Sequence, residues 1–118
     1  MDINEYITLS NLLDAYGALL TQRQLSIMEQ YVFEDCSLFE IAEREGITRQ
    51  GVRDAICTAT NRLKAFEDTL HLVKKASDTR NALKELMHHC VALPAEYREG
   101  IEAQLKELNR LWKFAEEE

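Results

Sequence analysis

The stretch at residues 37–56, SLFEIAEREGITRQGVRDAI, decides the fold of this chain. Ser37 is followed three residues later by Glu40, which is a capping box and predicts the start of a helix. Gly46 is placed to end that short helix in the left-handed conformation, and Thr48 is placed as the N-cap of the next helix. The pattern predicts two helices joined by a tight turn, as in a helix-turn-helix.

The apolar residues of this stretch fit the packing that a helix-turn-helix needs. Two short helices that cross steeply require a small residue at the crossing, and Ala42 is placed for that role. Larger apolar side chains must clamp the pair from both sides of the turn. The residues expected to do so are Ile41, Ile47, Val52 and Ile56.

If the second helix buries its Val52 side, its opposite side carries the residues suited to DNA. Arginine can hold guanine with two hydrogen bonds and glutamine can do the same for adenine, while a helix N-terminus suits a phosphate. The predicted base readers are Arg49, Gln50 and Arg53, the predicted phosphate contacts are Ser37 and Thr48, and Arg62 and Lys64 lie further along as flanking phosphate contacts.

The charge distribution favours a local contact with DNA. The formal net charge of the chain is -7, made of -7 on residues 1–47, +3 on residues 48–64 and -3 on residues 65–118. The one basic segment is the predicted second helix, and phosphates respond to local potential before total charge. Asp54 argues against the contact, because a carboxylate facing a groove repels phosphate.

Helices are also predicted on both sides of this unit. Residues 8–20 place one apolar face at helical steps, on Leu9, Leu12, Leu13, Tyr16, Leu19 and Leu20. Thr21 and Gln24 form a second capping box, which opens a helix with apolar positions at Leu25, Met28, Tyr31 and Val32. Asp35 suits the turn that ends it. The sequence thus predicts an all-α fold.

After Thr48 a single helix is predicted over residues 49–73. Its apolar positions form a heptad seam at Val52, Ile56, Ala59, Leu63, Phe66, Leu70 and Val73. Ser77 or Asp78 is expected to cap the next helix, with a face of Leu83, Leu86, Met87, Cys90 and Val91. Pro94 marks a further boundary, and a last helix has its face at Ile101, Leu105, Leu108, Trp112 and Ala115.

We therefore predict a helix-turn-helix domain with an N-terminal helix at residues 1–73, and a helical extension for self-association at residues 74–118. The two apolar seams need partners, which are either each other or a second subunit. The long seam exceeds what so few other residues can easily cover, which favours a homodimer. A two-fold dimer would set two recognition helices ~34 Å apart.

Residues 12–75 together resemble the fourth region of bacterial sigma factors, and resemble the YlxM family more closely. The stretches that carry the resemblance are LLDAYGALLTQRQ, SLFEIAEREGITRQGVRDAI and LKAFEDTLHLVKK. YlxM proteins are small bacterial proteins often encoded beside the signal recognition particle GTPase. The resemblance implies an all-helical fold, a sigma-like DNA-binding unit, a self-associating extension and a link to signal recognition particle components. It places the DNA contacts on Ser37, Thr48, Arg49, Gln50 and Arg53.

Other classes of function have no support in the sequence. No apolar run reaches the ~20 residues of a membrane span, and the N-terminus lacks the features of a signal peptide, so we expect a cytoplasmic protein with reduced cysteines. His88, His89 and Cys90 are adjacent, so on a helix they point about 100° apart and cannot share one metal ion. No phosphate loop or catalytic triad is visible. We expect no enzyme, no metal and no cofactor.

Two functional hypotheses stay open. The first is a DNA-binding regulator, favoured by the positive charge of residues 48–64. The second is an accessory factor that uses the same frame to bind a protein or RNA of the signal recognition particle, favoured by the negative charge of residues 1–47.

Overall fold

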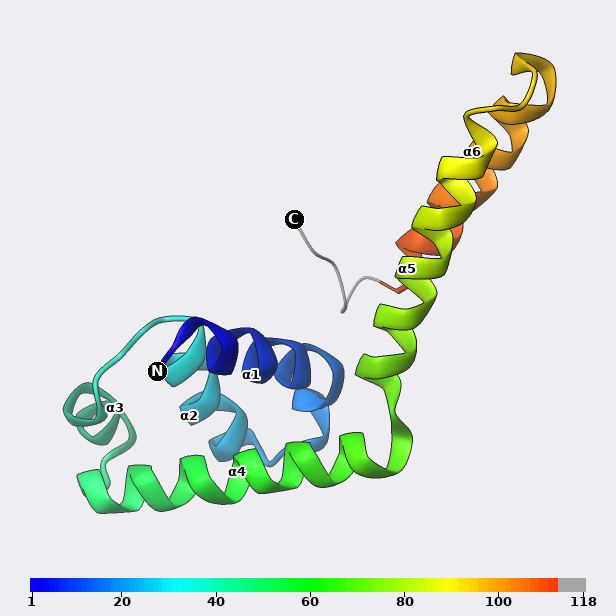
Figure 1. The fold of residues 1–118 in the computed structure, drawn as a ribbon. Helices are drawn as coiled ribbons and strands as arrows, with labels where there is room; N and C mark the ends of the chain where they lie inside the picture. The colour runs from blue at the N-terminus through cyan, green and yellow to red at the C-terminus, as the bar shows by residue number, and fades with distance from the viewer. Residues whose placement is uncertain (113–118) are drawn as a thin grey trace. The chain divides into compact units, whose positions relative to one another are not determined.

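The computed structural model describes residues 1–112, and every regular element in that range is a helix (Figure 1). The elements are α1 (Ile3–Tyr16), the 3-10 helix η1 (Gly17–Leu19), α2 (Gln22–Val32), α3 (Leu38–Glu45), α4 (Arg49–Leu70), α5 (Leu72–Cys90) and α6 (Ala95–Arg110). They form two units: unit 1 is Met1–His71, and unit 2 begins at Leu72. The predicted all-α class, with a helical C-terminal extension, is confirmed.

The N-terminal helix differs in extent from the predicted one. Asp2 caps α1 by accepting a hydrogen bond of 2.8 Å from the Glu5 N–H, so the helix begins at Ile3 and not at residue 8. It ends at Tyr16, and η1 follows. Because a 3-10 turn holds fewer residues than an α-turn, the predicted apolar face does not continue through it. Leu19 is 53% exposed and the expectation that it is buried is wrong, whereas Leu9, Leu12, Leu13, Tyr16 and Leu20 are buried as predicted.

Local signals set both ends of α2. The Thr21–Gln24 capping box is present, with two reciprocal hydrogen bonds of 3.1 Å. At the other end Asp35 has a φ of 52°, a left-handed conformation that Asp tolerates better than most residues. The capping box and a turn at Asp35 were predicted from the sequence, whereas the left-handed φ of Asp35 was not. The fully buried Ile27 was not among the predicted apolar positions, although it lies beside Met28, which was.

Helices α1, α2 and α3 all pack against α4, which forms the long axis of unit 1 (Figure 1). Ala59 and Leu63 of α4 have no exposed surface. Nearby, the Tyr16 ring lies 5.9 Å from the Phe66 ring, and the Tyr16 hydroxyl donates to the Glu67 carboxylate. The predicted apolar seam is therefore covered within unit 1 from Val52 to Phe66 without a second subunit, whereas Leu70 at the end of α4 is 43% exposed.

The predicted continuous helix over residues 49–73 is wrong. Helix α4 ends at Leu70, because His71 adopts a left-handed φ of 56° while its N–H donates to the Glu67 carbonyl. Helix α5 begins at Leu72, so Ser77 and Asp78 lie inside it and neither is its cap. An ion pair of 3.0 Å between Lys74 and Asp78, one helical turn apart, supports the continuous helix there.

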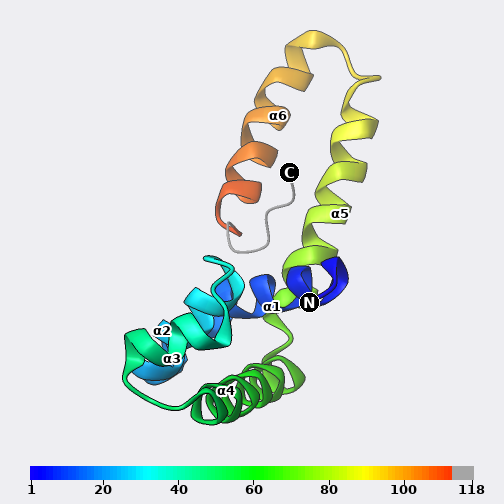
Figure 2. The same ribbon diagram turned by 90° about the vertical axis from the view of Figure 1, so that its left-hand side faces the viewer.

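Unit 2 is an antiparallel pair of helices, α5 and α6 (Figure 2). Pro94 precedes α6 as predicted. The core of the pair is small: Leu83 and Cys90 from α5 meet Leu105 from α6. Many apolar side chains stay exposed, among them Leu86, Met87, Val91, Tyr97, Ile101, Leu108 and Leu111. Ala115, the last predicted position of the α6 seam, lies outside the described residues.

Gly46 is the position at which the backbone most requires glycine. We expect Gly46→Ala to lower the free energy of unfolding by about 1 kcal/mol, because an L-residue pays that much for a left-handed φ. Urea unfolding followed by circular dichroism measures the change. Gly100→Ala is the matched control, since Gly100 lies inside α6 with open space around it and should raise stability slightly. If Gly46→Ala left the free energy of unfolding unchanged, the left-handed φ of Gly46 would not require glycine.

Candidate nucleic-acid interface

The contact between α3 and α4 is a closely packed apolar wedge. Its centre consists of Ile27 from α2, Ile41 and Ala42 from α3, and Val52 from α4. A half-buried ring surrounds them, made of Tyr31, Cys36, Leu38, Ile47, Ala55 and Ile56. Gly46, with a φ of 68°, makes the turn between the two helices. The predicted clamp is confirmed, and Ile27 adds a contribution from α2.

The N-terminus of α4 is capped by one side chain. Thr48 Oγ1 accepts a hydrogen bond of 2.9 Å from the Gly51 N–H. A Cβ at position 51 would lie 3.2 Å from this oxygen and 3.6 Å from Ile47 Cδ1. Gly51 therefore leaves room for the cap and the turn. Because Gly51 has no side chain, it cannot accept a hydrogen bond from the Thr48 N–H as a glutamate at this position would. The N-terminus of α4 therefore has no capping-box carboxylate.

The first turns of α4 present the predicted base readers to solvent. Arg49, Gln50 and Arg53 are all exposed. Within residues 1–112 neither arginine forms a hydrogen bond or an ion pair, so both guanidinium groups are available. Gln50 Nε2 donates to Asp54 Oδ1 at 3.0 Å. The Asp54 carboxylate, whose charge would repel a phosphate, is thus hydrogen-bonded to Gln50 on the same face of α4.

Ser37 sits in a different environment from Thr48. Its Oγ accepts from the Glu40 N–H and its own N–H donates to Glu40 Oε1, both at 3.1 Å. These hydrogen bonds hold the pKa of Glu40 below its ordinary value. The N-terminus of α3 therefore already holds an anion, which leaves Ser37 poorly placed to bind a phosphate.

The two flanking residues also differ from each other. Arg62 donates to Gln24 Oε1 at 2.8 Å and to the Leu19 carbonyl at 3.3 Å, and its guanidinium lies 5.6 Å from the centre of the Phe66 ring. Its side chain therefore joins α4 to η1 and α2 inside unit 1. Lys64 is exposed, but it lines a hollow together with Asp2 and Glu5.

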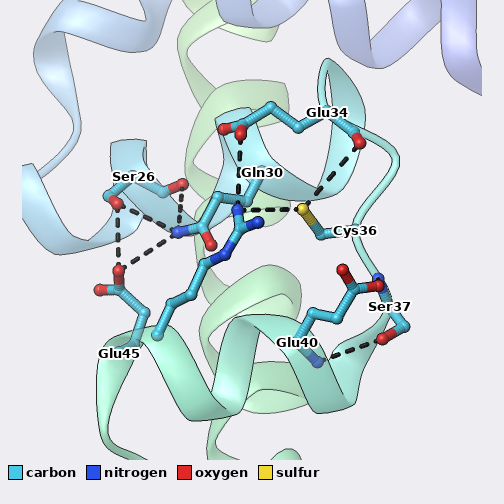
Figure 3. Close-up of polar contacts among 8 residues, drawn as sticks. Ser26, Gln30, Glu34, Cys36, Ser37, Glu40 and Glu45 are labelled. Atoms are coloured by element: carbon cyan, nitrogen blue, oxygen red, sulfur yellow. Dashed lines mark hydrogen bonds and ion pairs between the residues drawn. The ribbon is translucent and has the colours of Figure 1, made fainter.

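A polar network behind the wedge was not predicted (Figure 3). Gln30 is only 6% exposed, and its Nε2 donates to the Ser26 carbonyl, to Ser26 Oγ and to Glu45 Oε2, each at 3.2 Å. Arg23 adds a hydrogen bond of 3.3 Å to the Glu45 carbonyl. This network ties α2 to the end of α3. The only sequence signal for it is a glutamine one helical turn after Ile27, on the buried side of α2.

The second base of residues 1–47 is also paired. Arg44 Nη1 lies 3.4 Å from Glu34 Oε1 and 3.3 Å from Cys36 Sγ (Figure 3). Arg23 and Arg44 are the only bases before Thr48, so the available positive charge of the helix-turn-helix lies on α4.

The described residues hold no group of three or more His, Cys, Asp and Glu side chains that could bind a metal ion. His88 and His89 are exposed with ring centres 6.2 Å apart, while Cys90 is buried. The three cysteines are free. Across the same part of the chain, no helix has the length and apolarity needed to cross a membrane.

We expect the α3 capping box to make stability depend on pH. A depressed carboxyl pKa contributes stability above the ordinary glutamate value of 4.5, and this contribution is lost as pH falls through the lower folded pKa. Glu40→Gln should therefore cost stability near neutral pH and progressively less in acid, as measured by urea unfolding across that range. Glu43→Gln, an exposed change in the same helix outside the box, should show no such trend. Parallel pH profiles for both variants would contradict the assignment.

Comparison with known proteins agrees with this geometry. A model of the family UPF0122, "Putative helix-turn-helix protein, YlxM / p13 like", matches residues 3–107. A UPF0122 protein of Thermoanaerobacter sp. is 41% identical over 83 residues, which cover 70% of this chain and 71% of the relative. One from Clostridium acetobutylicum is 34% identical over 103 residues, covering 87% and 89%. No solved structure matches. The chain, as its sequence predicted, belongs to the UPF0122 family of YlxM / p13-like proteins.

Proposed function

We propose that this protein is a cytoplasmic DNA-binding regulator that inserts the first turns of α4 into the major groove. Arg49, Gln50 and Arg53 contact base edges, and Thr48 binds a phosphate at the helix N-terminus. One observation carries the proposal. The guanidinium groups of Arg49 and Arg53 are exposed and have no partner within the described residues, whereas Arg23, Arg44 and Arg62 are all bonded inside unit 1.

The exposed face also suggests which bases are read. Arginine pairs best with guanine. The Gln50–Asp54 bond uses Gln50 Nε2 as donor, which leaves Gln50 Oε1 and the second Asp54 oxygen as acceptors. Acceptors suit the amino groups of adenine and cytosine in the major groove. The target is then a site in which guanines flank an adenine or a cytosine.

We further propose that the protein is a homodimer held together through unit 2. Among its described residues this two-helix unit buries four apolar side chains, Ala76, Leu83, Cys90 and Leu105, which is little apolar surface for its size. Exposed apolar patches of this kind mark protein contacts, and a second copy offers the same patch for a self-complementary interface. A dimer supplies two recognition helices and so doubles the DNA contacts.

The DNA contact is tested by changing the two free arginines. Arg49→Ala and Arg53→Ala should each weaken binding to the duplex that a genomic selection enriches by about tenfold or more, since a bidentate arginine–guanine pair is worth ~1–3 kcal/mol. Fluorescence anisotropy at fixed salt measures the loss, and circular dichroism should show unchanged helicity.

The matched control is Lys75→Ala or Lys106→Ala made singly, because either change removes one positive charge from an exposed position of unit 2. It should leave affinity nearly unchanged. If selection at moderate salt enriches no sequence, or if the control weakens binding as much as the arginine changes, the proposal fails.

Dimerisation is tested on exposed apolar residues. Ile101→Ser and Leu108→Ser in α6 should convert a dimer into a monomer without loss of helicity, because they remove only surface apolar groups. Light scattering coupled to size exclusion records the mass. A monomeric wild type, or a dimer that survives both changes, would rule out this interface.

The alternative function is that of an accessory factor that binds a protein or RNA of the signal recognition particle without reading DNA. It is supported by α3, where Phe39 is 56% exposed and is followed by Glu40 and, about one helical turn on, by Glu43. If this function holds, Phe39→Ser and Glu43→Gln should reduce recovery of the signal recognition particle GTPase in pull-downs while DNA binding stays absent. Glu45 is unsuitable for this test, because it is bonded to Gln30 and Ser26.

A further inference from the structure

A second surface of unit 1 has no role in the proposed DNA contact. It is a hollow of about 550 Å³ where the start of α1 meets the end of α2. Its lining consists of Met1, Asp2, Ile3, Tyr6, Val32, Phe33 and Asp35. None of these residues belongs to the outer face of α4.

Exposed apolar side chains line the hollow alongside polar surface. Ile3 is 69% exposed, Phe33 is 47% exposed and Tyr6 is 40% exposed, while the adjacent Ile7 is 49% exposed. On α1 the residues Ile3, Tyr6 and Ile7 follow steps of three and four, which makes one helical stripe. The core-facing residues of α1 begin only at Leu9. The first two turns of α1 thus carry an exposed apolar stripe beyond the core of unit 1, and Phe33, directly after α2, adds to it.

The charged side chains that line the hollow are both acidic, and the α-amino group of Met1 adds an opposing charge. Asp2 and Asp35 are the charged side chains among its lining residues. Residues 1–35 contain six acids and a single base, Arg23, and Arg23 is bonded to Glu45 at the other end of α2. A nucleic acid or another anion is therefore repelled here, whereas a cationic apolar ligand is matched.

We propose that this hollow docks a basic amphipathic helix of another protein. The apolar face of that helix covers Ile3, Tyr6 and Phe33, and its lysine or arginine side chains pair with Asp2 and Asp35. This is the helix-in-groove mode of recognition, in which a few apolar anchors supply affinity and flanking charges supply specificity. The docking site leaves the α4 face free, so the protein can hold DNA and a protein partner at the same time.

The test uses an amphipathic helical peptide of leucine and lysine as the probe and the full protein labelled with nitrogen-15. Amide shifts should change around Tyr6, Phe33 and Asp35. Asp2→Asn combined with Asp35→Asn should weaken binding about tenfold, in the range of an interface hot spot. Asparagine keeps both local roles, since it also serves as an N-cap and also tolerates a left-handed φ.

The matched control is Glu85→Gln combined with Glu99→Gln, which removes the same charge from exposed positions of unit 2 and should leave affinity unchanged. Phe33→Ser should weaken binding of the peptide, and it should leave the mass of the protein without peptide unchanged. Equal losses in the control, shift changes confined to α5 and α6, or equal binding of a leucine–glutamate peptide would overturn the proposal. A fall in mass with Phe33→Ser would also overturn it, because a second copy of this chain would then occupy the hollow.

Discussion

The packing of Val52 against Ile41, Ala42 and Ile27 is the contact on which the rest of the helix-turn-helix depends. Val52, Ile41 and Ile27 have no exposed surface, and burying each such side chain is worth about 1.5–3 kcal/mol. This contact fixes the rotation of α4 about its axis. With the Val52 side facing inward, Arg53 lies about 100° away around the helix, and Arg49 is exposed at the first residue of α4. If this contact were looser, α4 could rotate about its own axis. Its exposed side chains would then no longer keep the one orientation that reading base edges requires.

An acidic protein can bind DNA when its bases are distributed as they are here. The formal net charge is -7, yet three of the acids before α4 are engaged in the fold: Glu40 closes a helix end, Glu45 bonds Gln30 and Ser26, and Glu34 pairs with Arg44. The surplus acid elsewhere weakens non-specific binding. Under the proposed function, DNA binding depends on the few contacts that α4 would make, so the affinity should come from base reading more than from phosphate charge.

Features set by neighbouring residues could be predicted from the sequence, and features set by distant residues could not. The capping boxes at Thr21 and Ser37, the left-handed Gly46 and the Thr48 cap each rest on residues within one turn of each other, and all are present. The break at His71 was missed because neither glycine nor proline marks it and because the apolar heptad continues in phase across it.

The candidate interface also combines features that follow from neighbouring residues with features that depend on distant ones. The outward positions of Gln50 and Arg53 follow from helical periodicity once Val52 is assigned to the core, whereas Arg49, three residues before Val52, is exposed because it begins the helix. The internal role of Arg62 depends on Leu19 and Gln24, which are distant in sequence, so periodicity gives no sign of it. The Gln30 network likewise joins two helices through side chains whose contact only the folded chain creates.

The most direct test of the account is an amide titration of the intact protein with the duplex it selects. If α4 is the reading helix, the largest shift changes will fall on residues 48–53, and the arginine side-chain signals of Arg49 and Arg53 will move with them. Changes that fall instead on α5 and α6 or on the first turns of α1, with residues 48–53 unaffected, would contradict it.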